Sequence, residues 1–377
     1  MGKRKITLLV LGILLLGVAA IGVFTLSMWN KPLGPSLELP SLTPSTDSIS
    51  PISDLSPLAT EPRPDPTQVI TSTQMATPDQ SGTPRPSPTA TSQPLCEGPE
   101  TMTILVIGSD QRGTGYLYGL ADSIHVVRID FSKPDVMIID FPRDLWVEIP
   151  DIASHHGITH GKLNQAYLFG NPGMGYYEGP GEGPGLLART LDKNFGLRVD
   201  HYLAIDTQTF IRMIDAVGGV DIKVEIPIDL NWGSNTPDPR FYLSVGTRHL
   251  DGELALLLAT NRVPSTFQRM IYQKMIMNAL RDKLLTPGMI PELPGLVTRF
   301  ITSVQTDLSM KDINSLLCIA LEVTNENIKA DSFPQEMFTA SGIYDPYRKV
   351  TTFIYEADFD QIKAMVKDFM DGVWPFP

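Results

Sequence analysis

Three apolar stretches rich in β-branched residues lie close together after residue 100. They cover Thr103–Gly108, Ser123–Asp130 and Asp135–Phe141. Such runs, bounded by turn residues, predict buried β-strands. Residues 132–134 (SKP) predict a reverse turn between the second strand and the third. The pattern therefore predicts three consecutive strands that neighbour one another in a sheet.

Strands and helices alternate along the rest of this region. HYLAID (His201–Asp206) has the pattern of a strand, and apolar residues at helical spacing follow in Thr207–Val217. Further strands are predicted in VDIKVEIP and NIKADSF, and further helices in Gly185–Asn194, DGELALLLAT, Thr266–Leu285, Met310–Leu321 and Asp358–Met370. Alternating elements of this kind predict an α/β fold. Residues 286–377 are predicted to complete the same domain.

The N-terminal residues have a different pattern. Lys3, Arg4 and Lys5 precede Ile6–Met28, which carries no charge and is long enough to cross a bilayer as a helix. By the positive-inside rule, the N-terminus of a single-pass anchor would be cytoplasmic and the rest extracytoplasmic. A cleaved signal peptide is the alternative. The length of the apolar run and the lack of a clear cleavage site favour a membrane anchor over residues 1–29.

Residues 30–99 are rich in proline, serine and threonine and contain few large apolar side chains. Such a composition does not bury enough surface to offset the loss of chain entropy on folding. It predicts a disordered linker between the anchor and an extracytoplasmic α/β domain at 100–377. The two cysteines are Cys96, within that linker, and Cys318, in an apolar helical run. We expect Cys318 to be a buried free thiol and do not expect a disulfide.

Charged residues gather where the predicted strands end. Asp110 follows the first strand, Asp122 begins the second, and Arg143 follows the third. Reversal at the predicted turns brings them to one edge of the sheet. Two carboxylates and an arginine there suit a divalent cation beside a phosphate, and Arg262 and Arg269 are further arginines with the forked geometry that binds phosphate. Ordinary surface ion pairs remain the alternative.

Composition and motifs exclude several other functions. The formal net charge of −12 and the absence of a basic stripe with interleaved aromatic residues argue against nucleic acid as a partner. The chain lacks a phosphate-binding P-loop and a serine-nucleophile motif. Residues 151–161 contain His155, His156 and His160. Their spacing matches no strong zinc motif, so we interpret them as histidines of a surface loop.

Several motifs resemble the LytR–CpsA–Psr (LCP) family of cell-wall glycopolymer ligases. The matching pieces, in the family's order, are ILVIGSDQR, ADSIHVVRID, DFPRDLWVEIP, GKLNQAY, GLRVDHYLAIDTQTFIRMIDAVGGVDI, LDGELALLLAT and FQRMIYQ. The resemblance implies a central mixed β-sheet flanked by helices in three layers. It also implies a phosphotransferase that moves a glycan from a polyprenyl-pyrophosphate lipid to peptidoglycan, beside the membrane and with Mg²⁺. An apolar slot for the lipid tail is expected to open near Arg143.

The resemblance also implies roles for individual residues. Asp110 and Asp122 fall at the family's magnesium ligands. The pyrophosphate-binding arginines correspond to Arg143, Arg262 and Arg269. Supporting positions in the substrate-binding motifs correspond to Asp144, Asn164 and Gln273.

The chain departs from the family pattern at several cationic positions. Leu120-Ala121 stands where an arginine is usual, and Thr260 replaces the first of a pair of arginines. Thr266 replaces an aspartate, and Tyr272 stands where a further arginine is common. Two hypotheses follow: an active transferase, or a weakened relative that binds polyprenyl-phosphate lipids or wall glycans without turnover.

Overall fold

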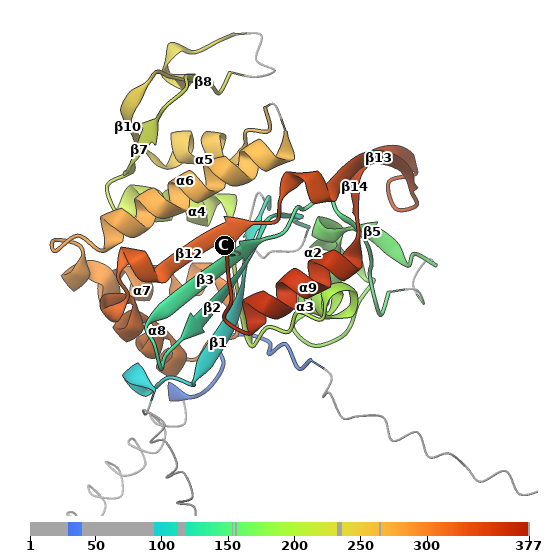
Figure 1. The fold of residues 1–377 in the computed structure, drawn as a ribbon, viewed down its shortest axis with the longest axis horizontal. Coiled ribbons are helices and arrows are strands. Elements are labelled where there is room, and N and C mark those ends of the chain that lie inside the picture. Colours follow the sequence, from blue (N-terminus) through green and yellow to red (C-terminus); the bar gives the residue numbers. More distant parts are fainter. Residues whose placement is uncertain are drawn as a thin grey trace, which may run out of the picture. The chain divides into compact units, whose positions relative to one another are not determined.

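The structure is a computed structural model, which describes residues 29–39, 94–111, 118–152, 154, 157–231, 236–263 and 265–375. Its centre is a six-stranded sheet in the order β11-β6-β1-β2-β3-β12 (Figure 1). These strands are β11 (Gln305–Thr306), β6 (His201–Asp206), β1 (Thr101–Ser109), β2 (Ala121–Asp130), β3 (Asp135–Asp140) and β12 (Ile328–Ser332). The β1–β2 and β2–β3 pairs are antiparallel, whereas β1–β6 and β3–β12 are parallel. The predicted mixed sheet is confirmed, and so are its three consecutive strands.

Helices flank the sheet. They are α2 (Leu163–Gly170), α3 (Glu182–Phe195), α4 (Thr207–Ala216), α5 (Gly252–Thr260), α6 (Thr266–Leu284), α7 (Leu293–Phe300), α8 (Met310–Glu322) and α9 (Phe359–Met370). The remaining strands form pairs outside the main sheet: β4 (Trp146–Glu148) with β5 (His160–Lys162), β7 (Val220–Val224) with β10 (Gly246–Leu250), β8 (Ile228–Asp229) with β9 (Tyr242–Leu243), and β13 (Phe338–Asp345) with β14 (Val350–Ala357).

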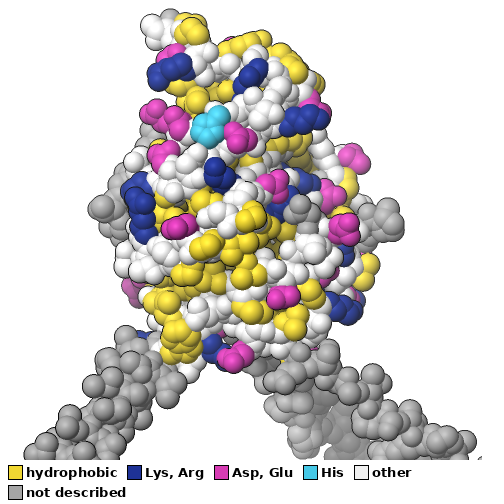
Figure 2. Space-filling model, turned by 90° about the vertical axis from the view of Figure 1, so that its left-hand side faces the viewer, with side chains coloured by type: hydrophobic (Ala, Val, Ile, Leu, Met, Phe, Trp, Pro, Cys, Tyr) yellow, Lys and Arg dark blue, Asp and Glu magenta, His cyan; other side chains and the backbone are white. Residues whose placement is uncertain are grey.

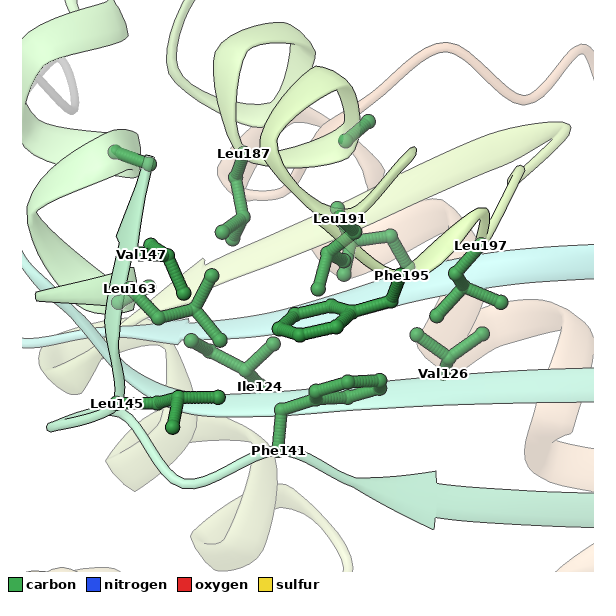
Figure 3. Packing of buried hydrophobic residues seen from close by; sticks show 14 of the residues in the cluster. Ile124, Val126, Phe141, Leu145, Val147, Leu163, Leu187, Leu191, Phe195 and Leu197 are labelled. Carbon is green, nitrogen blue, oxygen red and sulfur yellow. The ribbon is translucent and has the colours of Figure 1, made fainter. Parts of the chain in front are cut away.

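One face of the sheet packs against α2, α3 and α9. Ile124 and Val126 of β2 point toward Leu187, Leu191 and Phe195 of α3 (Figure 3). The rings of Phe141 and Phe195 lie 5.5 Å apart, between centroids. Because side chains alternate along a strand, every second residue of β2 serves this core. The residues between them point to the opposite face.

The opposite face packs against α8 and the short 3-10 helix η1 (Leu95–Glu97). Hydrophobic side chains also gather on the surface that Figure 2 presents, in the part of the molecule where α7 and α8 lie in Figure 1. Val297 of α7 and Leu317 of α8 are partly buried and pack against the core on this face of the sheet. The sheet is therefore covered by helices on both faces, as an α/β fold requires.

A disulfide joins Cys96 to Cys318, so the expectation of two free cysteines is wrong. Cys96 lies in η1, which packs on α8, and the backbone N–H of Leu95 donates to the carbonyl of Phe131 at 2.8 Å. The sequence pattern ended the linker a few residues too late. Composition identified the proline-rich stretch, but it could not show that its last residues pack against the domain.

The segment 29–39, which the pattern assigned almost entirely to the linker, also packs on the domain. Leu37 is only 3% exposed and belongs to the core beside α3. The N–H of Leu33 donates to the carbonyl of Leu308 at 3.2 Å. The predicted linker therefore has both its ends held against the same domain, while 40–93 lie outside the described residues.

The predicted membrane anchor at 1–28 likewise lies outside the described residues. Among the helices that the structure does describe, none has the length and apolar character needed to span a bilayer.

The hairpin formed by β13 and β14 was missed in the sequence. Its strands pair from Phe338 with Ala357 to Asp345 with Val350. Threonine, serine and glycine interrupt its apolar alternation, so the period-two signal is weak. Helix α7 was also missed, because Pro294 and Gly295 near its start predict a loop.

Candidate functional site

The site begins where β1 ends and β2 starts. The backbone N–H of Asp110 donates to the carbonyl of Leu120 at 3.0 Å, and the Asp110 carboxylate accepts from the N–H of Leu120 at 2.7 Å. Asp122 follows two residues later on β2. The prediction that Asp110 and Asp122 share one edge of the sheet is confirmed.

Arg143 reaches Asp122 from the segment after β3. Its Nη1 donates to Asp122 Oδ1, and its Nε donates to Asp144 Oδ2 at 3.3 Å. Burial alone would lower the pKa of Arg143, but the carboxylates of Asp122 and Asp144 outweigh it and raise that pKa above its ordinary value. Arg143 is therefore a permanently charged, largely buried cation at the strand edge.

Asp144 connects three parts of the chain. Besides Arg143, its carboxylate accepts from Lys162 Nζ at 2.9 Å and from Thr266 Oγ1 at 3.2 Å. Burial by itself raises the pKa of Asp144, yet Arg143 and Lys162 more than compensate, so its pKa is lowered. Asp144 thereby holds the start of α2 and the start of α6 at the arginine.

Arg269 enters from α6 and is 2% exposed. Its Nη1 lies 3.7 Å from Asp122 Oδ2, and neither Nη1 nor Nε has a hydrogen-bond partner among the described residues. Burial, followed by repulsion from Arg143, lowers the pKa of Arg269 to about 10. A buried cation with unused donors is costly unless an anion satisfies them.

The remaining predicted site residues are Arg262, Asn164 and Gln273, and they do not all lie at the buried arginines. Arg262 is exposed, but its positive charge contributes to the lowered pKa of Arg269, so the two guanidinium groups lie within electrostatic reach. Asn164 is buried, its Oδ1 has no partner, and its backbone N–H donates to the carbonyl of Arg143 at 3.1 Å. Gln273 donates from Nε2 to the carbonyl of Ala259 at 3.1 Å, which joins α6 to α5. The structure thus brings Arg143, Arg269 and Asn164 together.

Sequence reasoning missed Lys162 and did not assign Thr266 a place in the site. Lys162 lies within the GKLNQAY motif, immediately before α2, where its backbone N–H donates to Gln165 Oε1 at 2.7 Å. A lysine at the start of a helix, two residues before the motif asparagine Asn164, was the available signal. Thr266 was noted only as a departure from a family aspartate, although its hydroxyl binds Asp144.

A magnesium ion was predicted at Asp110 and Asp122. Within the ranges that the structure covers, no three histidine, cysteine, aspartate or glutamate side chains gather as a metal site. Mg²⁺ does not need such a cage, because it is usually bound by one or two carboxylates together with substrate phosphates. Two aspartates at one strand edge, beside an arginine with unused donors, fit that mode of binding. The magnesium assignment stays a prediction.

The predicted lipid slot also stays a prediction. Two pockets are lined partly by Asp200 and His201, at the end of the sheet where β1 begins, and neither includes Arg143.

Of the three loop histidines, His155 and His156 lie outside the described residues, and His160 lies in β5.

The fold is that of an α/β protein with a mixed central sheet, and its candidate site gathers paired carboxylates and buried arginines at one edge of that sheet. Residues 67–367 match the model of the LytR_cpsA_psr family. This match covers most of the sequence, so the chain belongs to the LytR–CpsA–Psr family, as its motifs predicted.

Individual relatives agree with this assignment. The regulatory protein MsrR of Staphylococcus aureus is 30% identical over 234 residues, which are 57% of this chain and 63% of MsrR. The polyisoprenyl-teichoic acid–peptidoglycan teichoic acid transferase TagV of Bacillus subtilis is 26% identical over 276 residues, 71% of this chain and 64% of TagV. The chain therefore spans less than two thirds of the length of these relatives.

The fold is also similar to a solved structure. The crystal structure of B. subtilis TagV superposes with a TM-score of 0.56 at 25% identity, and the match covers 74% of this chain and 99% of that chain.

Proposed function

We propose that this protein is a phosphotransferase that moves a glycopolymer from a polyprenyl-pyrophosphate carrier to peptidoglycan. The observation that carries the proposal is Arg269, a nearly fully buried cation whose Nε and Nη1 lack hydrogen-bond partners beside Arg143 and Asp122. A diphosphate supplies the anionic oxygens that such donors need, and arginine binds them through two parallel N–H groups. TagV is named a polyisoprenyl-teichoic acid–peptidoglycan teichoic acid transferase, which supports the same substrate class.

The residues of the site have separate tasks in this proposal. Arg143 and Arg269 bind the diphosphate and neutralise the charge that develops on the leaving polyprenyl phosphate. Asp144 keeps Arg143 in place and, through Thr266, fixes the start of α6. Asp110 and Asp122 would hold Mg²⁺, which supplies further neutralisation of the phosphate oxygens when bound. When the diphosphate enters, it replaces part of the contact that both arginines make with Asp122.

The test is release of polyprenyl phosphate by the purified full-length protein. The substrates are a polyprenyl-pyrophosphate-linked glycan and peptidoglycan strands, with Mg²⁺ present. Arg143→Ala and Arg269→Ala should each abolish measurable turnover, because one charged hydrogen bond contributes about 1.5–3 kcal/mol and each arginine would make more than one to the diphosphate. Arg281→Ala is the matched control, since Arg281 lies on the same helix and pairs with Asp282 at 2.7 Å. Normal turnover by Arg269→Ala would contradict the proposal.

A second function is favoured by one feature of the site. Both oxygens of Asp122 already face arginines, and Arg262 is exposed, so the cationic set around a substrate is smaller than the family pattern implies. A protein of this kind could bind lipid-linked phosphates without turning them over. Saturable binding of a polyprenyl pyrophosphate that depends on Arg269, with no product in the presence of Mg²⁺, would select this function.

We further propose that the domain is extracytoplasmic and anchored by residues 6–28. The Cys96–Cys318 disulfide supports this placement, because disulfides persist in oxidising compartments. External protease should remove the domain from intact protoplasts. A domain that survives until detergent is added would place it in the cytoplasm instead.

A further inference from the structure

A second polar cluster begins one residue from Asp122 and has no role in the site described so far. Ser123 and His125 alternate with the core residues Ile124 and Val126 on β2. Figure 3 shows Ile124 and Val126 directed toward α3, so Ser123 and His125 point to the opposite face of the sheet. His125 is 4% exposed.

The cluster is a continuous chain of hydrogen bonds. Ser123 Oγ contacts His125 Nε2, and His125 Nδ1 contacts Asp140 Oδ1. His125 and Asp140 are direct cross-strand partners, and Asp140 is also 4% exposed. Ser332 of β12 completes the row by donating from Oγ to Asp140 Oδ2 at 3.0 Å. Every polar atom of the Asp–His pair therefore has a partner within the sheet.

The order of the groups fixes the direction of the hydrogen bonds. A carboxylate accepts only, so the proton of a neutral His125 ring lies on Nδ1 and Nε2 is left as an acceptor. The hydroxyl of Ser123 must then donate to Nε2, which leaves its oxygen lone pairs free to accept a proton from outside. This is the arrangement by which a histidine, oriented by a carboxylate, withdraws a proton through a hydroxyl.

We infer that Ser123, His125 and Asp140 form a proton relay that serves the acceptor hydroxyl of the transfer reaction. This inference rests on the proposed function. The acceptor oxygen forms a bond to phosphorus while the bond from phosphorus to the oxygen of polyprenyl phosphate breaks. The acceptor proton passes to Ser123 Oγ, the proton of Ser123 passes to His125 Nε2, and the carboxylate of Asp140 stabilises the imidazolium until it releases the proton to water.

The relay begins beside the predicted magnesium ligands. The β1–β2 register shifts at this strand end, with Gly108 opposite Ser123 and Ser109 opposite Ala121, so Asp122 is the extra residue of a bulge next to Ser123. Ser123 is half-buried, and its strand partner is Gly108, two residues before Asp110. A diphosphate held by the arginines at Asp122 would therefore lie next to Ser123, within reach of an acceptor hydroxyl bound there.

The decisive variant is Asp140→Asn in the full-length protein, assayed with the same lipid-linked glycan and peptidoglycan strands. An amide at 140 donates to Nδ1, so the ring proton moves to Nε2, which then cannot accept from Ser123. The expected result is a loss of kcat on the order of 100-fold, the scale of one general-base step, with the KM for the lipid donor nearly unchanged. His125→Gln and Ser123→Ala should show the same loss, and Ser123→Thr should recover most of it because the hydroxyl is retained.

Ser332→Ala is the matched control. It removes a hydrogen bond to the same carboxylate but leaves the tautomer of His125 unchanged. A purely structural row of polar side chains would make Ser332→Ala and Asp140→Asn similar in turnover and in thermal stability. That result would overturn the relay.

Two further outcomes separate the relay from the function on which it rests. Nitrogen NMR of His125 should show Nδ1 protonated in the wild type and Nε2 protonated in Asp140→Asn, whatever the activity. If Asp140→Asn turns over normally while Arg269→Ala does not, the transferase proposal stands and the relay is wrong. A wild-type protein without any turnover would overturn both.

Discussion

At the scale of single residues, the main feature of the site is the buried positive charge of Arg269, which lowers the stability of the folded protein. Arg269 is buried, repelled by Arg143 and separated from Asp122 by 3.7 Å, and its pKa falls to about 10. It is still protonated at neutral pH, so the folded protein carries an incompletely compensated cation. Functional sites commonly retain such groups because a ligand, and not the fold, satisfies them.

The first prediction follows from this cost. Arg269→Met should raise the free energy of unfolding by about 1–3 kcal/mol, because an apolar side chain replaces a buried charge while Arg143 still pairs with Asp122. Chemical denaturation at pH 7 measures the gain. Arg281→Met, at a partly exposed position of the same helix, should change stability by less than about 0.5 kcal/mol. A marked destabilisation by Arg269→Met would mean that Arg269 serves the fold.

The second prediction concerns Asp144 and pH. The pKa of Asp144 is lowered from 3.8 in the folded protein, so its carboxylate adds stability above that value and loses it as pH falls through the lower folded pKa. Asp144→Asn should therefore cost about 3 kcal/mol at pH 7, since it leaves Arg143 and Lys162 with a weaker partner. The difference from wild type should shrink as the pH is lowered below 3.8.

Asp151→Asn is the control for Asp144. The Asp151 side chain is 49% exposed and pairs with Arg189 at 3.0 Å, and exposed pairs contribute about 0–1 kcal/mol. If the difference in unfolding free energy between Asp144→Asn and wild type does not change across this pH range, Asp144 is not an ionised carboxylate that stabilises the fold through Arg143 and Lys162.

At the scale of elements, the disulfide fixes η1 to α8 and closes a loop with a sequence separation of 222 residues. Cross-links that close long loops restrict the unfolded chain most strongly. Cys96→Ser with Cys318→Ser should lower the free energy of unfolding by about 3–5 kcal/mol. The site, at the opposite end of β1, should keep its affinity for lipid-linked diphosphate. Unchanged stability in the double variant, compared with wild type under oxidising conditions, would show that the cross-link restrains little.

At the scale of the whole molecule, the residues on either side of the proline-rich segment pack close to each other on the domain. Leu39 and Glu97 line neighbouring pockets that both include Asp200 and His201. All described residues, from both sides of the segment, fall in one compact unit. The segment is thus an insertion between two packed flanks of the domain.

The fourth prediction tests that insertion. Replacement of residues 41–92 by about 12 glycine and serine residues, which span roughly 20 Å as a flexible chain, should preserve the fold and the Cys96–Cys318 disulfide. Thermal unfolding and thiol titration check both. Deletion of residues 29–39 in addition is the contrast, because it removes Leu37 from the core and should lower stability by about 2–3 kcal/mol. Loss of folding in the first variant alone would contradict the insertion.

Much of the fold and part of the site could be read directly from local patterns. Period and turn residues determined the strands that form β1, β2 and β3, and β6 was bounded as the structure has it. Strand direction then brought Asp110 and Asp122 to one edge, because consecutive antiparallel strands alternate their ends. These features depend on neighbouring residues and on the short-range geometry of the chain, so the sequence by itself determined them.

Only the tertiary structure decided the rest. Cys96 bonds to Cys318 because η1 packs on α8. The register of β2, β3 and β12 places His125 beside Asp140, and Asp140 beside Ser332. The burial of Arg269 and its unused donors depend on where α6 crosses the strand edge. Those contacts join residues that are far apart in sequence, and burial depends on how the layers pack. Local sequence patterns therefore predict neither the contacts nor the burial. The amino-acid sequence determined which groups are available for chemistry, and packing decided which of them meet and which are held without a partner.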